Sequence, residues 1–226
     1  MNKVINLDAF SGMIQSNQVI MVGGFGLIGA PLTLIQALED IDVNGLTIIS
    51  NNLGEPGKGL GKLLLQGKIR KAVGSYFTSN KDVGDFVNQN RLEVELVPQG
   101  TLSERIRSGG AGIGGFYTQT SVGTLLAEGK ETREIDGATY VFEPALKADV
   151  ALIRAHKADE YGNLVYYKTA QNFNPQMATA AKLVIAEVDE IVPVGQLDPE
   201  QIGTPHVYVD YLVKSQIKIE DVKKIG

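Results

Sequence analysis

One stretch decides the fold of this 226-residue chain: Val19-Ile20-Met21-Val22-Gly23-Gly24-Phe25-Gly26-Leu27-Ile28-Gly29-Ala30-Pro31. Its first four residues are apolar, which is typical of a strand buried on both faces of a parallel sheet. Glycines then punctuate residues 23–29, which we call the glycine loop. Pro31 suits the first turn of a helix, and apolar residues follow it at helical spacing. The stretch therefore predicts a strand, a loop and a helix in succession.

The same alternation continues along the chain. Further strands are expected at residues 46–49, 71–75 and 94–97, and helices at residues 31–38, 63–65, 82–89 and from 102 to 106. Strands that alternate with helices at this spacing indicate βαβ units. We therefore expect an α/β fold: an open, mainly parallel, Rossmann-like sheet with helices on both faces.

The second half is less regular. Residues 109–115, Gly-Gly-Ala-Gly-Ile-Gly-Gly, are too rich in glycine for a helix or a strand, so we expect a loop. A structural or subunit-contact role is favoured for it, and a second loop that a ligand approaches closely is the alternative. Further strands are expected at residues 138–142, 150–154, 164–166 and 183–187. The charged residues 215–226 are expected to form a frayed tail. With no repeat and no linker, residues 1–226 are expected to form a single domain.

Composition excludes several classes of protein. The chain has no cysteine, which removes disulfides, thiolate metal sites and a cysteine nucleophile. Its 21 basic and 26 acidic residues give a net charge of −5, and without a basic run nucleic acid is a poor partner. No apolar stretch reaches the roughly 18 residues of a membrane span, and the first residues lack a signal-peptide pattern. We expect a cytoplasmic protein without a membrane partner.

Residues 24–29 match the dinucleotide-binding pattern G-x-G-x-x-G. That pattern also requires an acidic residue after the second strand, and here the second strand ends in Ser50-Asn51-Asn52. An NAD(P)-dependent oxidoreductase therefore remains only an alternative. Backbone amides in such a loop, together with the helix that follows, suit a carboxylate, a phosphate or another oxyanion. The other alternative is a tight turn whose glycines serve packing alone.

Over a longer span the chain closely resembles the family I coenzyme A transferases. The glycine loop has their G-G-F-x-x-x-G-x-P signature, and the sequence departs from it only at the preceding pair, Ser16-Asn17. Blocks at residues 50–52, 98–112, 129–137, 158–164 and 172–175 also agree with the family. The resemblance extends to about Lys214 and is to the α subunit of the 3-oxoacid type, which includes the succinyl-CoA:acetoacetate and butyrate–acetoacetate enzymes.

The resemblance implies an enzyme that transfers coenzyme A from an acyl-CoA to a short carboxylic acid. The route is ping-pong, through a glutamyl-CoA thioester. The family's nucleophilic glutamate lies in a Ser-Glu-Asn-Gly-type motif on the β subunit, and this chain has no such motif. We therefore expect no catalytic residue here, an α2β2 assembly with a β subunit, and no cofactor or metal beyond coenzyme A as substrate. A non-catalytic protein that binds coenzyme A esters is a further alternative.

The acidic residues have ordinary interpretations. Glu143 is expected to close a turn before Pro144, Glu187 and Asp189 to cap a helix or lie on the surface, and Asp159 to hydrogen-bond within a turn. Glu55 and Glu160 also lie outside the motif. The two histidines, His156 and His206, have no matching partners, and neither H-E-x-x-H nor G-x-S-x-G occurs, so hydrolase and metal-site interpretations lack an anchor.

By resemblance, the coenzyme A or substrate contacts fall on Gly23, Gly24, Phe25, Gly26, Leu27, Ile28 and Gly29. Asn51 and Gln99 are added because each follows a predicted strand at its carboxyl end, where open α/β sheets bind ligands. An amide there donates to a carbonyl or carboxylate without adding charge. For Gly24→Val we expect a blocked ligand space with the fold largely intact.

Overall fold

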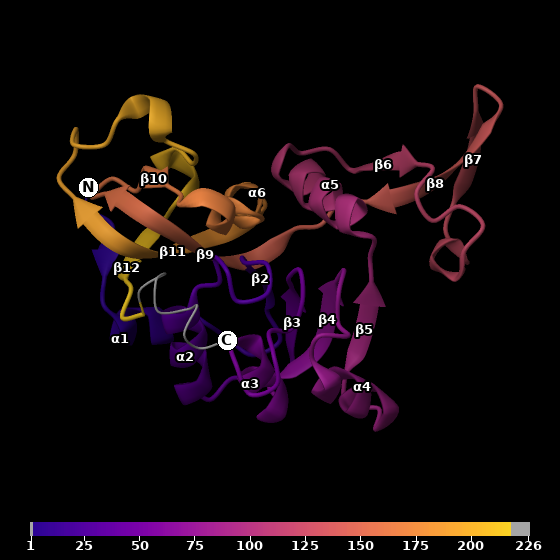
Figure 1. Ribbon diagram of the computed structural model, residues 1–226, viewed down its shortest axis with the longest axis horizontal. Coiled ribbons are helices and arrows are strands. Elements are labelled where there is room, and N and C mark those ends of the chain that lie inside the picture. Colours follow the sequence, from indigo (N-terminus) through magenta and orange to yellow (C-terminus); the bar gives the residue numbers. More distant parts are fainter. Residues whose placement is uncertain (1, 218–226) are drawn as a thin grey trace.

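The computed structural model describes residues 2–217. Within them, nine strands form one sheet: β1 (Val4–Ile5), β2 (Val19–Val22), β3 (Leu46–Ile49), β4 (Ile69–Gly74), β5 (Glu93–Leu96), β9 (Ala148–Asp159), β10 (Leu164–Val165), β11 (Ala181–Val192) and β12 (Tyr211–Lys214). The strand order is β1-β12-β11-β9-β2-β3-β4-β5, with β10 beside β9 (Figure 1). Every pair is parallel except β9 and β10. The predicted open, mainly parallel sheet is confirmed.

Helices cover both faces of this sheet, as the sequence predicts. One face carries α1 (Leu7–Ser11), α2 (Leu32–Asp40), α3 (Leu60–Leu65) and α4 (Lys81–Asn88), and the other carries α5 (Gln99–Gly110) and α6 (Asn174–Thr179) (Figure 1). Each face has its own apolar core: Phe10, Leu34 and Leu63 belong to the first, and Leu102 and Met177 to the second. Short 3-10 turns occur at Leu125–Ala127, Lys168–Gln171, Pro199–Gln201 and His206–Tyr208.

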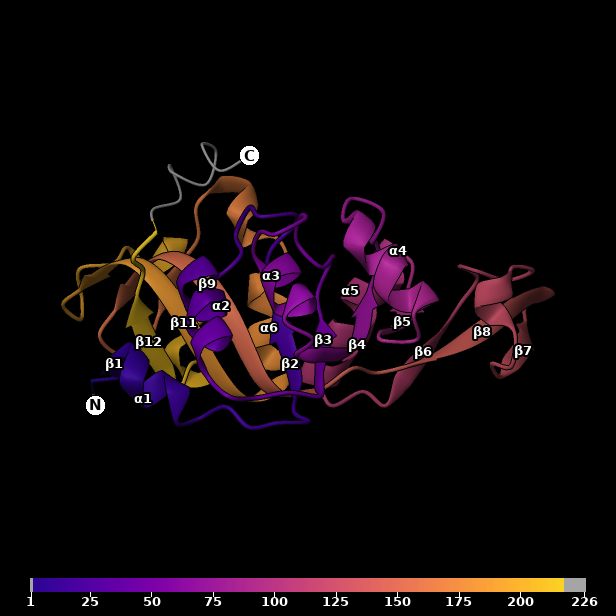
Figure 2. The same ribbon diagram turned by 90° about the horizontal axis from the view of Figure 1, so that it is seen from below.

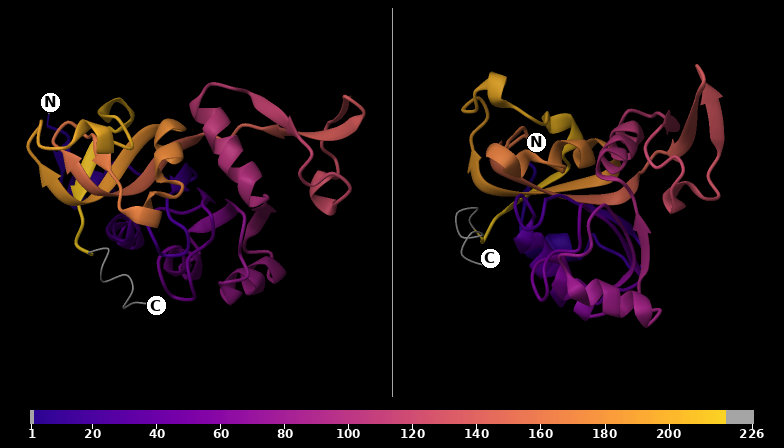
Figure 3. Two further views of the ribbon diagram at one scale, coloured as in Figure 1. Left: turned by 45° about the horizontal axis from the view of Figure 1, so that its top comes forward. Right: turned by 45° about the vertical axis from the view of Figure 1, so that its right-hand side comes forward.

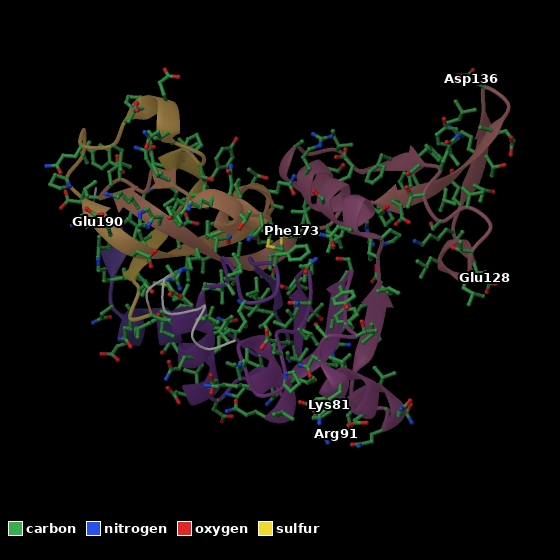
Figure 4. All side chains as sticks on the ribbon, viewed as in Figure 1. Lys81, Arg91, Glu128, Asp136, Phe173 and Glu190 are labelled. Carbon is green, nitrogen blue, oxygen red and sulfur yellow. The ribbon has the colours of Figure 1, made fainter. Side chains whose placement is uncertain are left out.

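A second, three-stranded sheet was not foreseen from the sequence. Its strands, β6 (Gly115–Thr118), β7 (Thr132–Ile135) and β8 (Ala138–Pro144), pair antiparallel in the order β6-β8-β7. They form an arm that projects from the body of the molecule (Figures 2 and 3), with Glu128 and Asp136 at its far end (Figure 4). The strand expected at residues 138–142 thus exists, but outside the parallel sheet.

Most predicted elements are present, with shifted ends. The strands at residues 19–22 and 46–49 are confirmed as predicted, and those at 150–154 and 183–187 are parts of strands of 12 residues each. Strands β1, β6, β7 and β12 and helices α1 and α6 were not predicted from the sequence. All of these are short, so their own residues carry little periodic signal.

The expectation that residues 109–115 form neither helix nor strand is wrong at both ends. Gly109 and Gly110 are the last residues of α5, and Gly115 begins β6. A Cβ atom at Gly109 would lie 1.9 Å from the Leu146 carbonyl oxygen, and one at Gly110 would lie 2.0 Å from Oγ1 of Thr179. These glycines therefore permit close packing of α5 rather than a flexible loop.

Residues 215–217, the described part of the expected frayed tail, are not frayed. The Ser215 amide donates to the Val188 carbonyl at 2.8 Å, and the Gln216 amide donates to Oγ1 of Thr33 at 3.0 Å. These bonds fix residues 215–217 against the sheet and α2. Residues 218–226 lie outside the described part of the chain. No helix among residues 2–217 has both the length and the apolar character needed to cross a bilayer.

Two helical glycines give a matched test of the packing of α5. Gly109→Ala places a methyl group against the Leu146 carbonyl, and we expect the free energy of unfolding to fall by about 1–3 kcal/mol. Gly84→Ala in α4 meets no atom within 4 Å, and we expect a gain of about 1 kcal/mol from helix propensity. Urea unfolding measures both. Equal stabilisation by the two substitutions would contradict the close packing of α5.

Candidate functional site

Parallel pairing brings the carboxyl ends of four neighbouring strands to one edge of the sheet. The glycine loop follows β2, Asn51 follows β3 and Ser75 follows β4. Gln99 begins α5, three residues after β5 ends at Leu96. The Ser50 hydroxyl donates to the Val22 carbonyl at 2.8 Å and so joins the ends of β2 and β3. The residues proposed from separate parts of the sequence therefore share one edge, where α/β sheets bind ligands.

Three side chains at this edge form one hydrogen-bonded cluster. The Asn51 amide nitrogen donates to Oε1 of Gln99 at 2.7 Å and lies 3.0 Å from the Ser75 hydroxyl, which itself donates to the same Gln99 oxygen. Asn51 is only 1% exposed, whereas Gln99 is exposed. Because two donors hold Oε1 of Gln99, its Nε2 group keeps both hydrogens for another acceptor: no residue from 2 to 217 accepts from it. Ser75 was missed as a site residue because the sequence places it at the end of the predicted strand 71–75, whereas β4 ends at Gly74.

The glycine loop is a tight turn closed by its own backbone. The Phe25 amide donates to the Ile28 carbonyl at 2.9 Å, and the Ile28 amide donates back to Phe25 at 3.2 Å. Phe25 is 54% exposed at the turn, whereas Leu27 is 7% exposed and belongs to the core. The Leu27 side chain thus points into the core, and only the backbone of Leu27 is left to contact a ligand.

Several amides of the loop are left without partners. Among residues 2–217, no hydrogen bond uses the amide of Gly26, Leu27 or Gly29. Gly26 has a positive φ of 61°, and a Cβ atom built on it would meet nothing within 4 Å. Helix α2 begins three residues after the loop, but the buried Glu187 carboxylate accepts from its Thr33 and Leu34 amides and compensates the charge of its N-terminus, so the donors on offer are those of the loop itself. The loop therefore offers donors to an oxyanion near Gly26.

Other glycines of the loop are required for packing. A Cβ atom at Gly23 would lie 1.9 Å from Oδ1 of Asn174, and one at Gly29 would lie 2.5 Å from the Ala170 carbonyl. The packing alternative therefore describes Gly23 and Gly29, whereas Gly26 is open. These contacts come from residues 170–174, which were not among the site residues predicted from the sequence.

A second glycine-rich turn lies beside the first. In residues 54–61 the Lys58 amide donates to the Glu55 carbonyl at 3.0 Å, and Glu55 also pairs with the Lys58 side chain at 3.5 Å. The two turns enclose a cavity of about 10 Å³, lined in part by Gly26, Ser50 and Asn52, which is close to the volume needed by one water molecule. The polar residues Ser50 and Asn52, which follow β3 at the sheet edge, thus also line the cavity between the two turns.

Glu187 is not a surface group, which corrects that part of the prediction. It lies within β11, is 0% exposed, and caps α2 by accepting from the amides of Thr33 at 2.8 Å and Leu34 at 3.2 Å. Arg154 pairs with its other oxygen at 2.9 Å, and the Ser215 hydroxyl donates to that oxygen too. Burial raises the pKa of Glu187, against the opposing effect of the Arg154 charge and these hydrogen bonds. Every oxygen of this carboxylate is already occupied.

Glu143 does not close a turn, which is a second correction. It lies within β8, is 0% exposed, and pairs with Lys130 at 2.6 Å. Arg105 of α5 lies 3.8 Å from Glu143 and 2.8 Å from Glu95 of β5, so these charges join the arm to the body. Burial favours a higher pKa for Glu95, but Arg105 and Lys71 outweigh it and leave that pKa below its usual value.

Asp159 and the histidines are the remaining polar residues for which the sequence predicted a turn or argued against a metal site. Asp159 accepts from the amides of Tyr161 at 3.1 Å and Asn163 at 3.0 Å, so its predicted turn is confirmed. His156 lies on strand β9, and its Nδ1 atom is 3.3 Å from Oδ2 of Asp189 on β11. Among residues 2–217, no group of three or more histidine, aspartate and glutamate side chains could hold a metal ion.

The fold and this edge define an α/β protein with uncharged hydrogen-bond donors gathered at one edge of its parallel sheet. The model of the Coenzyme A transferase family matches residues 7–215, and the chain belongs to that family. It is 55% identical over 205 residues to one subunit of the succinyl-CoA:3-ketoacid coenzyme A transferase of Xanthomonas campestris, covering 91% of this chain and 85% of that one. It is 44% identical to the alpha subunit of the acetate CoA-transferase of Escherichia coli K12, covering 95% and 97%.

A solved structure supports the same fold. The acyl-CoA transferase YdiF of Escherichia coli O157:H7, crystallised as a thioester complex with CoA, superimposes with a TM-score of 0.86 at 22% identity. The match covers 96% of this chain and 48% of that one, so this chain spans about half of the YdiF polypeptide. With these relatives, an NAD(P)-dependent oxidoreductase has no support beyond the six-residue pattern.

The structure changes the expected effect of Gly24→Val. Gly24 has a φ of +120°, and a Cβ atom there would lie 3.0 Å from Ala30, so valine strains the backbone before any ligand binds. We expect Gly24→Val to lower the free energy of unfolding by about 1–3 kcal/mol and Gly26→Ala to cost about 1 kcal/mol. Urea unfolding of the unliganded chain distinguishes them. A larger cost at Gly26 would contradict the open space found there.

Proposed function

We propose that this chain is the α subunit of a heteromeric coenzyme A transferase. In this proposal it moves coenzyme A between an acyl-CoA, such as succinyl-CoA or acetyl-CoA, and a short 3-oxoacid or fatty acid, such as acetoacetate. The observation that carries the proposal is the convergence of uncharged donors at one sheet edge, the Gly26 amide and Nε2 of Gln99, without an uncommitted carboxylate among them. Both relatives are named as single subunits of larger enzymes, which supports a partner for this chain.

The acidic residues of this chain support a nucleophile from the partner. Glu187 is buried and bonded to Arg154 and α2, and Glu143 lies in the arm, paired with Lys130. Glu55 lies in the turn beside the glycine loop, where it pairs with Lys58, and is the alternative nucleophile from this chain. A carboxylate paired with a cation is a weaker nucleophile than an unpaired one. We therefore propose that the attacking glutamate belongs to a β subunit, within an α2β2 assembly.

The proposed reaction balances in two halves. The partner's carboxylate attacks the thioester carbonyl, a C–O bond forms, and coenzyme A leaves as a thiolate, giving a mixed anhydride. The thiolate then attacks the glutamyl carbonyl and releases the first acid as a carboxylate, which leaves a glutamyl-CoA thioester. The acceptor acid repeats these steps in reverse order and departs as the new acyl-CoA. No metal, redox step or further cofactor is required by this sequence of bonds.

The proposed roles of this chain are electrostatic. Each attack places negative charge on a carbonyl oxygen, and a preorganised donor to such an oxygen is typically worth about 3–4 kcal/mol. In this proposal the Gly26 amide supplies one such bond, because it has no partner among residues 2–217 and the space beside Gly26 is open. Gln99 donates through Nε2 to the substrate's carboxylate or carbonyl, because Asn51 and Ser75 hold its oxygen. A neutral amide leaves the attacking carboxylate unpaired, which a lysine at this position would not.

Reconstitution with the partner tests the proposal. We expect transfer from succinyl-CoA to acetoacetate only when this chain is mixed with a β subunit, and acetyl-CoA and butyrate serve as the alternative donor and acceptor. After borohydride reduction of the covalent adduct, mass spectrometry is expected to find the modified glutamate on the β subunit. Modification of Glu55, or full transfer by this chain alone, would refute the half-enzyme proposal. Binding of coenzyme A esters without transfer by the complex would favour the non-catalytic alternative.

Gln99→Ala tests the proposed donor. We expect kcat of the complex to fall about 10²-fold, the typical cost of losing one such hydrogen bond. Association with the β subunit, measured by gel filtration, is expected to remain unchanged. Weakened association with normal turnover would instead make Gln99 an interface residue.

A further inference from the structure

The two ends of the glycine loop are joined by a single side chain from a distant part of the sequence. The Gly24 amide donates to Oδ1 of Asn172 at 3.1 Å, and Nδ2 of Asn172 donates to the Ile28 carbonyl at 3.0 Å. Within the loop itself, the turn is closed by the two backbone bonds between Phe25 and Ile28. The amide of Asn172 thus acts as a bracket across the loop, with its acceptor at one end and its donor at the other.

Asn172 is itself held rigidly. Nδ2 also donates to the Thr169 carbonyl at 3.0 Å, and Oδ1 accepts from the Phe173 amide at 2.7 Å. The residue has a positive φ of 20°, which is uncommon for any residue other than glycine. Phe173, only 5% exposed, anchors the segment in the core between α6 and the sheet (Figure 4). The bracket is therefore fixed by contacts that do not involve the loop.

The neighbouring Asn174 has a different task. It is 0% exposed, accepts from the Arg154 amide at 2.9 Å, and donates to the Gly29 carbonyl at 3.0 Å. Gly23 packs directly against it. Asn174 thus fastens the base of the loop to β9, and its loss would damage the core. Asn172 is half-buried and contacts the turn itself, so it can be changed with less damage.

We propose that Asn172 is a positioning residue for transfer of coenzyme A, acting through the glycine loop rather than on the substrate. The inference rests on the proposed function, in which the Gly26 amide donates to the carbonyl oxygen. Donors of this kind lower the barrier only when their geometry is fixed in advance, and displacements near 1 Å are costly. Asn172 sets the distance between Gly24 and Ile28 and so the direction of the amides between them.

The test compares two asparagine variants in the complex with the β subunit. Asn172→Ala removes both bonds to the loop. The control, Asn163→Ala, removes a half-buried amide that bridges Asp159 and His206 in a turn after β9. We expect both variants to lower the melting temperature by a similar amount. Only Asn172→Ala is expected to reduce kcat, by about 10-fold or more, with KM for the acyl-CoA within two-fold of the wild type.

A third variant separates the two halves of the bracket. Asn172→Asp keeps an acceptor for the Gly24 amide but replaces the donor to Ile28 with an oxygen that faces two carbonyl groups. We expect its kcat to fall at least as far as that of Asn172→Ala. Asn172→Gln is not expected to restore activity, because its longer chain displaces the amide.

Hydrogen exchange of the loop gives a readout that does not depend on activity. The hydrogen-bonded amides of Gly24, Phe25 and Ile28 are expected to exchange faster in Asn172→Ala than in the wild type or Asn163→Ala. Faster exchange with wild-type kcat, or an equal loss of kcat in both alanine variants, would overturn the inference. If the wild-type complex transfers no coenzyme A, the proposed function fails, and loop exchange still decides whether Asn172 holds the loop.

Discussion

Parallel strand pairing is the constraint on which the rest of this molecule depends. Because β2, β3, β4 and β5 run in one direction, the residues that follow each strand all arrive at the same edge of the sheet. Asn51 and Gln99 are 48 positions apart in sequence, yet their amides share a 2.7 Å hydrogen bond. Without the common strand direction, the donors of the candidate site would be dispersed over two edges.

The candidate site is built from uncharged groups, whereas two networks of buried charges hold the surrounding elements together. Arg154, Glu187 and Ser215 join β9, β11 and the end of the described chain to the first turn of α2. Arg105 and Glu143 tie the arm to α5. Removing one partner of such a buried pair is expensive, since the other charge is left uncompensated. These networks therefore fix the framework, and in our proposal the neutral amides bind the ligand.

The division between groups that pack the framework and groups that we propose bind the ligand also runs through the glycine loop. Gly23 and Gly29 are glycines because neighbouring residues occupy the space of a side chain. Gly26 is a glycine at a positive φ in open space, which suits close approach of a ligand to the backbone. One six-residue pattern thus serves packing and, in our proposal, binding. This is why the pattern alone could not distinguish a dinucleotide site from a coenzyme A site.

The sequence by itself determined the α/β class, the parallel sheet, the glycine loop and the positions of Asn51 and Gln99, because apolar runs and strand ends are local signals. It misplaced Gly109, Gly110, Glu143 and Glu187, whose surroundings come from residues distant in sequence. Only the tertiary structure decided that Ser75 joins the two amides and that Asn172 brackets the loop. Both are polar contacts across many residues, and a side chain carries no local mark of the partner that folding will bring to it.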